Sequence, residues 1–89
     1  MNKFEWKNSI LGREFDQYIR EHSGIAEKIP QGAVIALQVK GDDEFNKWSQ
    51  NLALEQAEEG QLIIYVNIKK IRESRSRIEE LELASAIDS

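Results

Sequence analysis

Hydrophobic and polar residues alternate along the chain with periods that change from one segment to the next. The first segment carries hydrophobic residues at helical spacing, namely Phe4, Leu11, Phe15, Tyr18 and Ile19. This stripe predicts an amphipathic helix over residues 4–22. Ile25 and Ile29 then fit one short helical turn, which Pro30 ends because proline disfavours a helical residue before it.

Two apolar runs in the middle of the chain predict strands. Residues 33–40 form a short apolar run next to glycines, which is typical of a strand with both faces buried. Residues 62–70 form a second run, which turns polar at Asn67 and Lys69. Between them, residues 43–59 carry a helical apolar stripe that begins with acidic residues, as helix starts often do. A strand, a long crossover and a second strand predict a βαβ unit with parallel strands.

The pattern of the last segment fits two structures. Ile78, Leu81 and Ala84 recur every three residues, as on a loose helical stripe. Leu81, Leu83 and Ile87 instead follow the alternation of a strand. A helical tail and an extended tail therefore both stay open.

The small size of this sheet bears on assembly. The 89 residues predict one domain, residues 1–89, of α/β class with α+β as the alternative, in which residues 74–89 form a partly independent tail. A sheet needs three or more strands, or good helical cover, to be stable alone, and exposed edges invite pairing. We therefore expect a homodimer that extends the sheet by edge pairing, by exchange of tails or by both. A compact monomer whose tail covers the sheet is the alternative.

Composition narrows the class of protein. The chain is 40% hydrophobic and 31% charged, as in soluble globular proteins. It has no apolar run near the length of about 18 residues that spans a bilayer, and its first residues lack the apolar core of a signal peptide. We expect no membrane association and a cytoplasmic location. The absence of cysteine excludes disulfides, thiol catalysis and thiolate metal sites within the chain.

Charge is unevenly distributed along the chain. The net charge is −4, yet residues 69–77 carry five basic residues against Glu73, which leaves +4. These basic residues are Lys69, Lys70, Arg72, Arg75 and Arg77. The favoured interpretation is a solvated strand end that the following acidic tail neutralises. Contact with the acidic surface of a protein partner and contact with nucleic acid are the alternatives.

Residues that could support chemistry are few. His22 is the only histidine and falls where the first helix is expected to end, a position at which imidazole stabilises the helix dipole. Asp42, Asp43 and Glu44 lack the spacing of a calcium loop and suit a helix start. The glycines form no phosphate-binding motif. We expect no catalytic residue, no metal ligand and no cofactor.

Several segments together resemble a known family. They are LGREFDQYIREH, IAEKIP, GDDEFNKW and EEGQLIIYVNIKK, and the similarity extends from Leu11 to about Arg77. The chain resembles a small uncharacterised prokaryotic family, a domain of unknown function of similar length. The resemblance implies a prokaryotic cytoplasmic protein and supplies no activity or site residues.

Three functional hypotheses remain. The leading one is a non-enzymatic, self-associating protein-interaction or regulatory module, antitoxin-like in character, with Trp6, Ile78, Leu81 and Leu83 as candidate interface residues. The second is a small nucleic-acid-binding protein that uses residues 69–77. The third is a ligand-binding or enzymatic protein with a pocket at the carboxyl ends of the strands, where ligands of α/β sheets bind.

Overall fold

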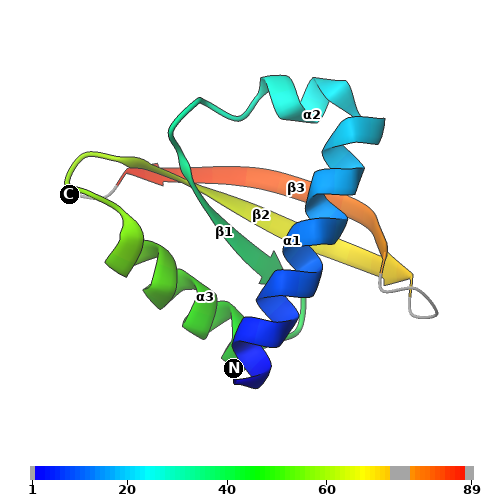
Figure 1. Ribbon diagram of the computed structural model, residues 1–89, viewed down its shortest axis with the longest axis horizontal. Helices are drawn as coiled ribbons and strands as arrows, with labels where there is room; N and C mark the ends of the chain where they lie inside the picture. Colours follow the sequence, from blue (N-terminus) through cyan, green and yellow to red (C-terminus); the bar gives the residue numbers. More distant parts are fainter. Residues whose placement is uncertain (1, 73–76, 88–89) are drawn as a thin grey trace.

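The computed structural model describes residues 2–72 and 77–87 and contains helices on a small sheet (Figure 1). In chain order the elements are α1 (Lys3–Glu21), α2 (Ser23–Glu27), β1 (Val34–Val39), α3 (Asp43–Gln56), β2 (Leu62–Arg72) and β3 (Arg77–Ile87). The first five elements are those that the sequence predicts, with bounds that differ by a few residues at most.

The strands form a mixed sheet in the order β1-β2-β3. Strands β1 and β2 are parallel, with Val34 opposite Ile63, which confirms the βαβ unit. Strand β3 runs antiparallel to β2, with Leu62 opposite Ile87. Of the two alternatives for the tail, the extended one is therefore correct and the helical one is wrong. The mixed sheet makes the protein α+β, which is the alternative class.

The tail is extended because a strand lets its leucines reach the core while its glutamate reaches a lysine on the other face. In β3, Leu81 and Leu83 pack against the main core from one face of the strand. Glu82, between them, points to the other face and meets Lys69 of β2. A helix would place Leu81 and Leu83 on different sides, since two residues turn it by about 200°.

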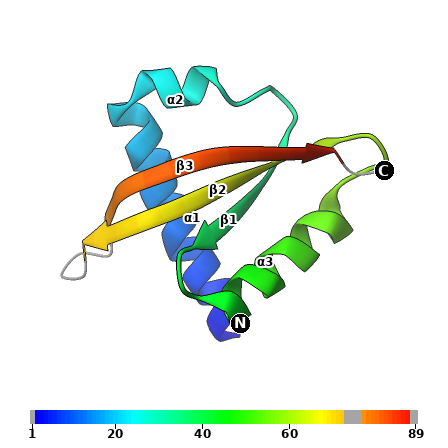
Figure 2. The same ribbon diagram turned by 180° about the vertical axis from the view of Figure 1, so that it is seen from behind.

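Helices cover the two faces of the sheet unequally. Helix α1 packs across one face and builds the main core, whose buried members are Leu11, Phe15, Leu37, Phe45, Ile64, Val66, Ile68 and Ile78. Helix α3 lies along β1, where Ala53 packs against Ala36 and Ile63. Ala36 and Ile63 alternate with core-facing neighbours and so belong to the opposite face of the sheet. Figure 2 looks onto that face, with α1 behind the strands and α3 beside β1.

Local signals set the helix starts. Asn2 caps α1 by accepting a hydrogen bond from the Glu5 N–H at 2.8 Å, and the Glu5 carboxylate accepts from the Asn2 N–H in return. Gly41, at φ 87°, turns the chain out of β1. Asp42 then caps α3 by accepting from the Phe45 N–H at 3.2 Å.

Candidate functional site

The described part of the basic segment is paired with acidic residues of β3. Lys69 Nζ lies 2.9 Å from Glu82 Oε2, and Lys70 Nζ lies 4.0 Å from Glu80 Oε2. The hydrogen bond to Glu82, helped by the attraction of that carboxylate, raises the pKa of Lys69 above its usual range. These contacts are the neutralisation by the acidic tail that the sequence predicts. Lys69 and Lys70 are thus exposed lysines on β2, and the neighbouring strand β3 supplies a carboxylate to each of them.

For the three arginines of this segment, the structure gives at most the position of the backbone. Arg72 and Arg77 are opposite each other at the ends of β2 and β3. Arg75 lies outside the described residues. Of the five candidate cations, Lys69 and Lys70 are the two whose described contacts include a carboxylate of β3.

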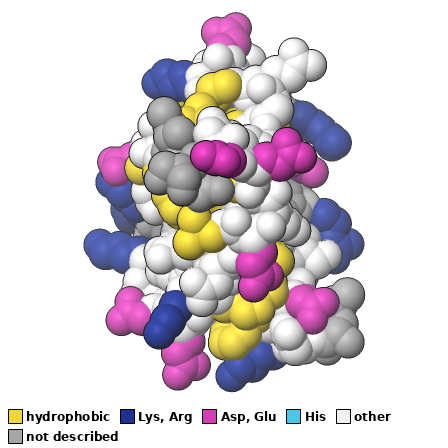
Figure 3. Space-filling view, turned by 90° about the vertical axis from the view of Figure 1, so that its left-hand side faces the viewer, with side chains coloured by type: hydrophobic (Ala, Val, Ile, Leu, Met, Phe, Trp, Pro, Cys, Tyr) yellow, Lys and Arg dark blue, Asp and Glu magenta, His cyan; other side chains and the backbone are white. Residues whose placement is uncertain are grey.

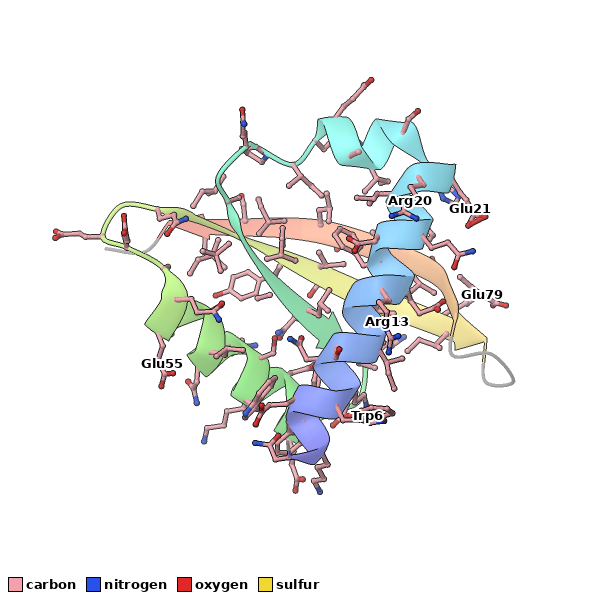
Figure 4. All side chains as sticks on the ribbon, viewed as in Figure 1. Trp6, Arg13, Arg20, Glu21, Glu55 and Glu79 are labelled. Carbon is pink, nitrogen blue, oxygen red and sulfur yellow. The ribbon has the colours of Figure 1, made fainter. Side chains whose placement is uncertain are left out.

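The candidate interface residues fall into two groups. Ile78 is buried, and Leu81 and Leu83 pack against the same core. Trp6 is 57% exposed, near the N-terminal end of α1. Figure 4 shows Trp6 at the opposite side of the molecule from the later part of β3. Ile78, Leu81 and Leu83 thus face the core of their own chain, and the backbone edge of β3 is what reaches outward.

The outer edge of β1 is closed by helix α3. The Asn46 side-chain amide donates to the Val39 carbonyl at 2.8 Å, and its oxygen accepts from the Val39 N–H at 2.7 Å. This pair of bonds is what a neighbouring strand would offer. Gln38 adds a second closure, since its amide donates to the Leu37 carbonyl at 2.9 Å and its oxygen accepts from Gln50 at 2.7 Å. The edge of β1 is thereby blocked against another strand at its carboxyl end, from Leu37 to Val39.

Among the described residues, no strand pairs with the outer edge of β3, so its backbone groups point outward at alternate residues. The Ile68 carbonyl accepts from the Lys40 N–H, so Ile68 directs its backbone groups to β1 and the next residue on β2 directs them to β3. In the regular part of the ladder, Ala84 and Ala86 therefore bond to β2. The N–H and C=O groups of Leu83 and Ser85 point away from the sheet.

Protection of the β3 edge is confined to its first half. Glu79, Glu80 and Glu82 are exposed there, and the register with β2 shifts around Lys70. Charges and bulges both discourage pairing at an edge. Residues 83–87 read LASAI and carry neither a charge nor a proline, and their register with β2 is regular. The second half of β3 is an uncharged and regular strand edge.

A hollow of about 250 Å³ lies beside this half of β3. Its lining residues are Lys28, Pro30, Leu62, Ile64, Leu83, Ala84 and Ser85. Figure 3 looks at the molecule from the end where β3 finishes and shows hydrophobic side chains at the surface among charged ones. The uncharged strand edge therefore borders a partly apolar depression.

Two open grooves flank α1, toward β1 and α3 and away from the β3 edge. One, of about 390 Å³, is bordered by β1 and lined by Asn8, Ser9, Gly12, Arg13, Phe15, Asp16, Ile35 and Leu37. The other, of about 590 Å³, is bordered by α3 and lined by Glu5, Asn8, Ser9, Trp48, Leu52 and Gln56. Neither lining includes a histidine, so the hydroxyl of Ser9 has no imidazole base beside it in either groove.

The remaining candidates for chemistry have structural roles. His22 follows α1, where its Nδ1 donates to the Tyr18 carbonyl at 2.9 Å and its ring stacks on that of Tyr18. Asp42 caps α3 and pairs with Lys7. Lys7 and the Phe45 N–H hold the pKa of Asp42 below its ordinary value. Among the described residues, no three acidic or histidine side chains gather into a metal site.

Comparison with known proteins places the chain in a family. The sequence model of DUF5647, a family of unknown function, matches residues 3–81. The chain belongs to the DUF5647 family. Neither the curated proteins nor the solved structures gave a match to this DUF5647 chain. In residues 2–72 and 77–87, no helix is long and apolar enough to cross a membrane.

The closure of β1 is the feature of this DUF5647 protein that sequence reasoning missed. Asn46 reads as an ordinary polar residue on a helix surface. Only the βαβ connection brings α3 back along β1 and places its amide beside Val39. One usable signal was available, since a polar residue one turn into a crossover helix can reach the end of the preceding strand.

Proposed function

We propose that this protein is a non-enzymatic interaction module that self-associates through the outer edge of β3. The observation that carries the proposal is the contrast between the two sheet edges. The edge of β1 is closed by Asn46, whereas Leu83 and Ser85 present backbone donors and acceptors outward from an uncharged segment. A regulatory role through protein contacts, antitoxin-like in character, suits such a module.

Three further observations support self-association over the alternatives. The sheet has three strands and α3 lies along β1, so the β3 side of the sheet is available for extension. For the nucleic-acid alternative, Lys69 and Lys70 are already paired with Glu82 and Glu80. For the enzymatic alternative, neither groove beside α1 places a histidine next to the Ser9 hydroxyl.

Sedimentation equilibrium of the native protein at micromolar concentrations tests the proposal. The expected mass is twice that of the 10.3 kDa chain. Ser85→Pro removes an outward N–H without removing a bond to β2, and proline is tolerated on edge strands, so this variant is expected to be monomeric. Ser85→Ala is the matched control and keeps the dimer mass. Trp6→Ala, which changes an exposed residue away from this edge, also keeps it.

A native mass equal to one chain would contradict the proposal. A Ser85→Pro variant that folds, as judged by its circular dichroism, and still sediments as a dimer would show that another surface mediates the contact. In that case a loss of the dimer in Trp6→Ala would move the interface to α1.

A further inference from the structure

We infer that two copies of this chain pair their β3 strands antiparallel, about a two-fold axis at Ala84. The inference rests on the proposed self-association and adds the register, so that the site on each chain is completed by the other. It follows from charge, from the regular length of β3 and from the hollow beside the strand.

Charge excludes an axis in the first half of β3. An axis at Glu82 would set this carboxylate opposite the partner's Glu82. An axis at Leu81 would set Glu80 opposite the partner's Glu82. Like charges directly opposite each other destabilise a sheet, and both of these acids are exposed. The axis therefore lies beyond Glu82.

The regular part of β3 selects the position within the second half. Residues 81–87 pair with β2 without a register shift, and Ala84 is the midpoint of that segment. With the axis at Ala84, every residue of the segment has an opposite residue on the other chain. The outward groups of Leu83 then bond to the partner's Ser85, and Glu82 is opposite the partner's Ala86.

Side-chain size and the hollow fit the same register. Ala84 faces its own copy as a non-hydrogen-bonded pair, in which Cα atoms approach to about 4.5 Å and small side chains are favoured. Ala84 is exposed and has room for this approach. On the other face, the register sets the partner's Leu83 beside Ser85, which lines the hollow of about 250 Å³. Association would thus add an apolar side chain at the depression.

Single-cysteine variants test the register, because the native chain contains no cysteine. Ala84→Cys is expected to convert almost entirely to a covalent dimer under mild oxidation, since Cα atoms about 4.5 Å apart are within disulfide reach. Glu82→Cys is the matched control. Its two copies would be about 14 Å apart along the strands, beyond the limit of about 7 Å, so it stays monomeric on a non-reducing gel.

A mixture of Glu82→Cys and Ala86→Cys supplies an independent test that leaves Ala84 unchanged. The register places these two cysteines opposite each other, so the mixture is expected to yield the mixed covalent dimer, and neither variant alone does so. A native protein of dimer mass in which Glu82→Cys bridges to itself, or in which neither Ala84→Cys nor the mixture forms a bridge, would overturn the register while self-association stands. A native protein of monomer mass would overturn both.

Discussion

The side-chain amide of Asn46 forms two hydrogen bonds with the backbone of Val39, at 2.7 and 2.8 Å, and so takes the place of a strand at the edge of β1. This contact joins α3 to the end of the strand that precedes it. It also makes the two edges of the sheet unequal, because the second half of β3 has no such closure from the described residues. Another strand could therefore be added to this small sheet at the β3 edge.

Replacing Asn46 with alanine should destabilise the fold. Each lost hydrogen bond contributes about 0.5–1.5 kcal/mol net, so we expect Asn46→Ala to lower the free energy of unfolding by about 1–3 kcal/mol. Urea denaturation of the native and variant proteins measures the difference. Asn51→Ala, at an exposed position of the same helix, is the control and should change stability by less than about 0.5 kcal/mol. Equal effects of the two substitutions would show that the Asn46 contact contributes nothing.

The pairing of Asp42 with Lys7 predicts a dependence of stability on acidity. The pKa of Asp42 is lower in the folded chain than in the unfolded chain, chiefly because Lys7 donates a hydrogen bond to the carboxylate. The contribution to stability is therefore present above the ordinary aspartate pKa and is lost as the pH falls through the lowered value.

A carbon-detected NMR titration measures this pKa directly. We expect Asp42 to titrate below the ordinary aspartate range in the native protein and to move back toward that range in Lys7→Gln. The stability difference between native protein and Asp42→Asn should shrink from neutral pH to about pH 2. An Asp42 pKa that is the same in the native protein and in Lys7→Gln would show that Lys7 does not lower it.

Gly12 offers a stabilising substitution. It lies inside α1, and a Cβ built there meets no atom within 4 Å. Gly12→Ala should raise the free energy of unfolding by about 0.5–1 kcal/mol, because glycine has more backbone freedom to lose on folding. Gly41→Ala is the contrasting variant, since Gly41 has φ 87°, and should lower stability by about 1–3 kcal/mol. Thermal unfolding followed by circular dichroism compares the two.

Much of the fold could be predicted from the sequence, but the spacing of hydrophobic residues did not decide the structure of the tail. The periods of α1, β1, α3 and β2 are clear, and each element appears where its pattern indicates. Ile78 and Leu81 are three residues apart, a spacing that suggests a helix. In the structure both residues lie on strand β3 and face the main hydrophobic core. They share one side of the strand because the register with β2 shifts between them. A bulge changes strand parity and cannot be recognised from spacing alone.

The candidate site was predicted only in part. The neutralisation of Lys69 and Lys70 followed from the order of charges along the chain, since a basic strand end next to an acidic tail can fold back on itself. The closure of β1 was missed, because it depends on a contact between Val39 and a helix residue whose sequence context is ordinary apart from its place one turn into the crossover helix. Leu81 and Leu83 were expected at an interface as side chains, yet they face inward and leave the backbone as the exposed feature.

Because Lys69 and Lys70 are paired with Glu82 and Glu80, we expect the native protein to bind nucleic acid too weakly to give a gel shift. Glu80→Gln with Glu82→Gln should increase retention of single-stranded RNA in a gel shift at low salt, because both lysines lose their counter-charges and the net charge changes from −4 to −2. The native protein should show no shift in the same buffer. A salt-dependent shift of the native protein that Lys69→Glu with Lys70→Glu abolishes would favour the nucleic-acid alternative.

Amide hydrogen exchange at two adjacent residues tests self-association through β3 most directly. The Ala84 N–H bonds to β2 within one chain, whereas the Leu83 N–H points to the outer edge. In the native protein followed by NMR over a dilution series, we expect slow exchange at Ala84 throughout. We expect exchange at Leu83 that is slow at high concentration and becomes fast on dilution. Fast exchange at Leu83 at every concentration, with Ala84 protected, would contradict self-association through β3.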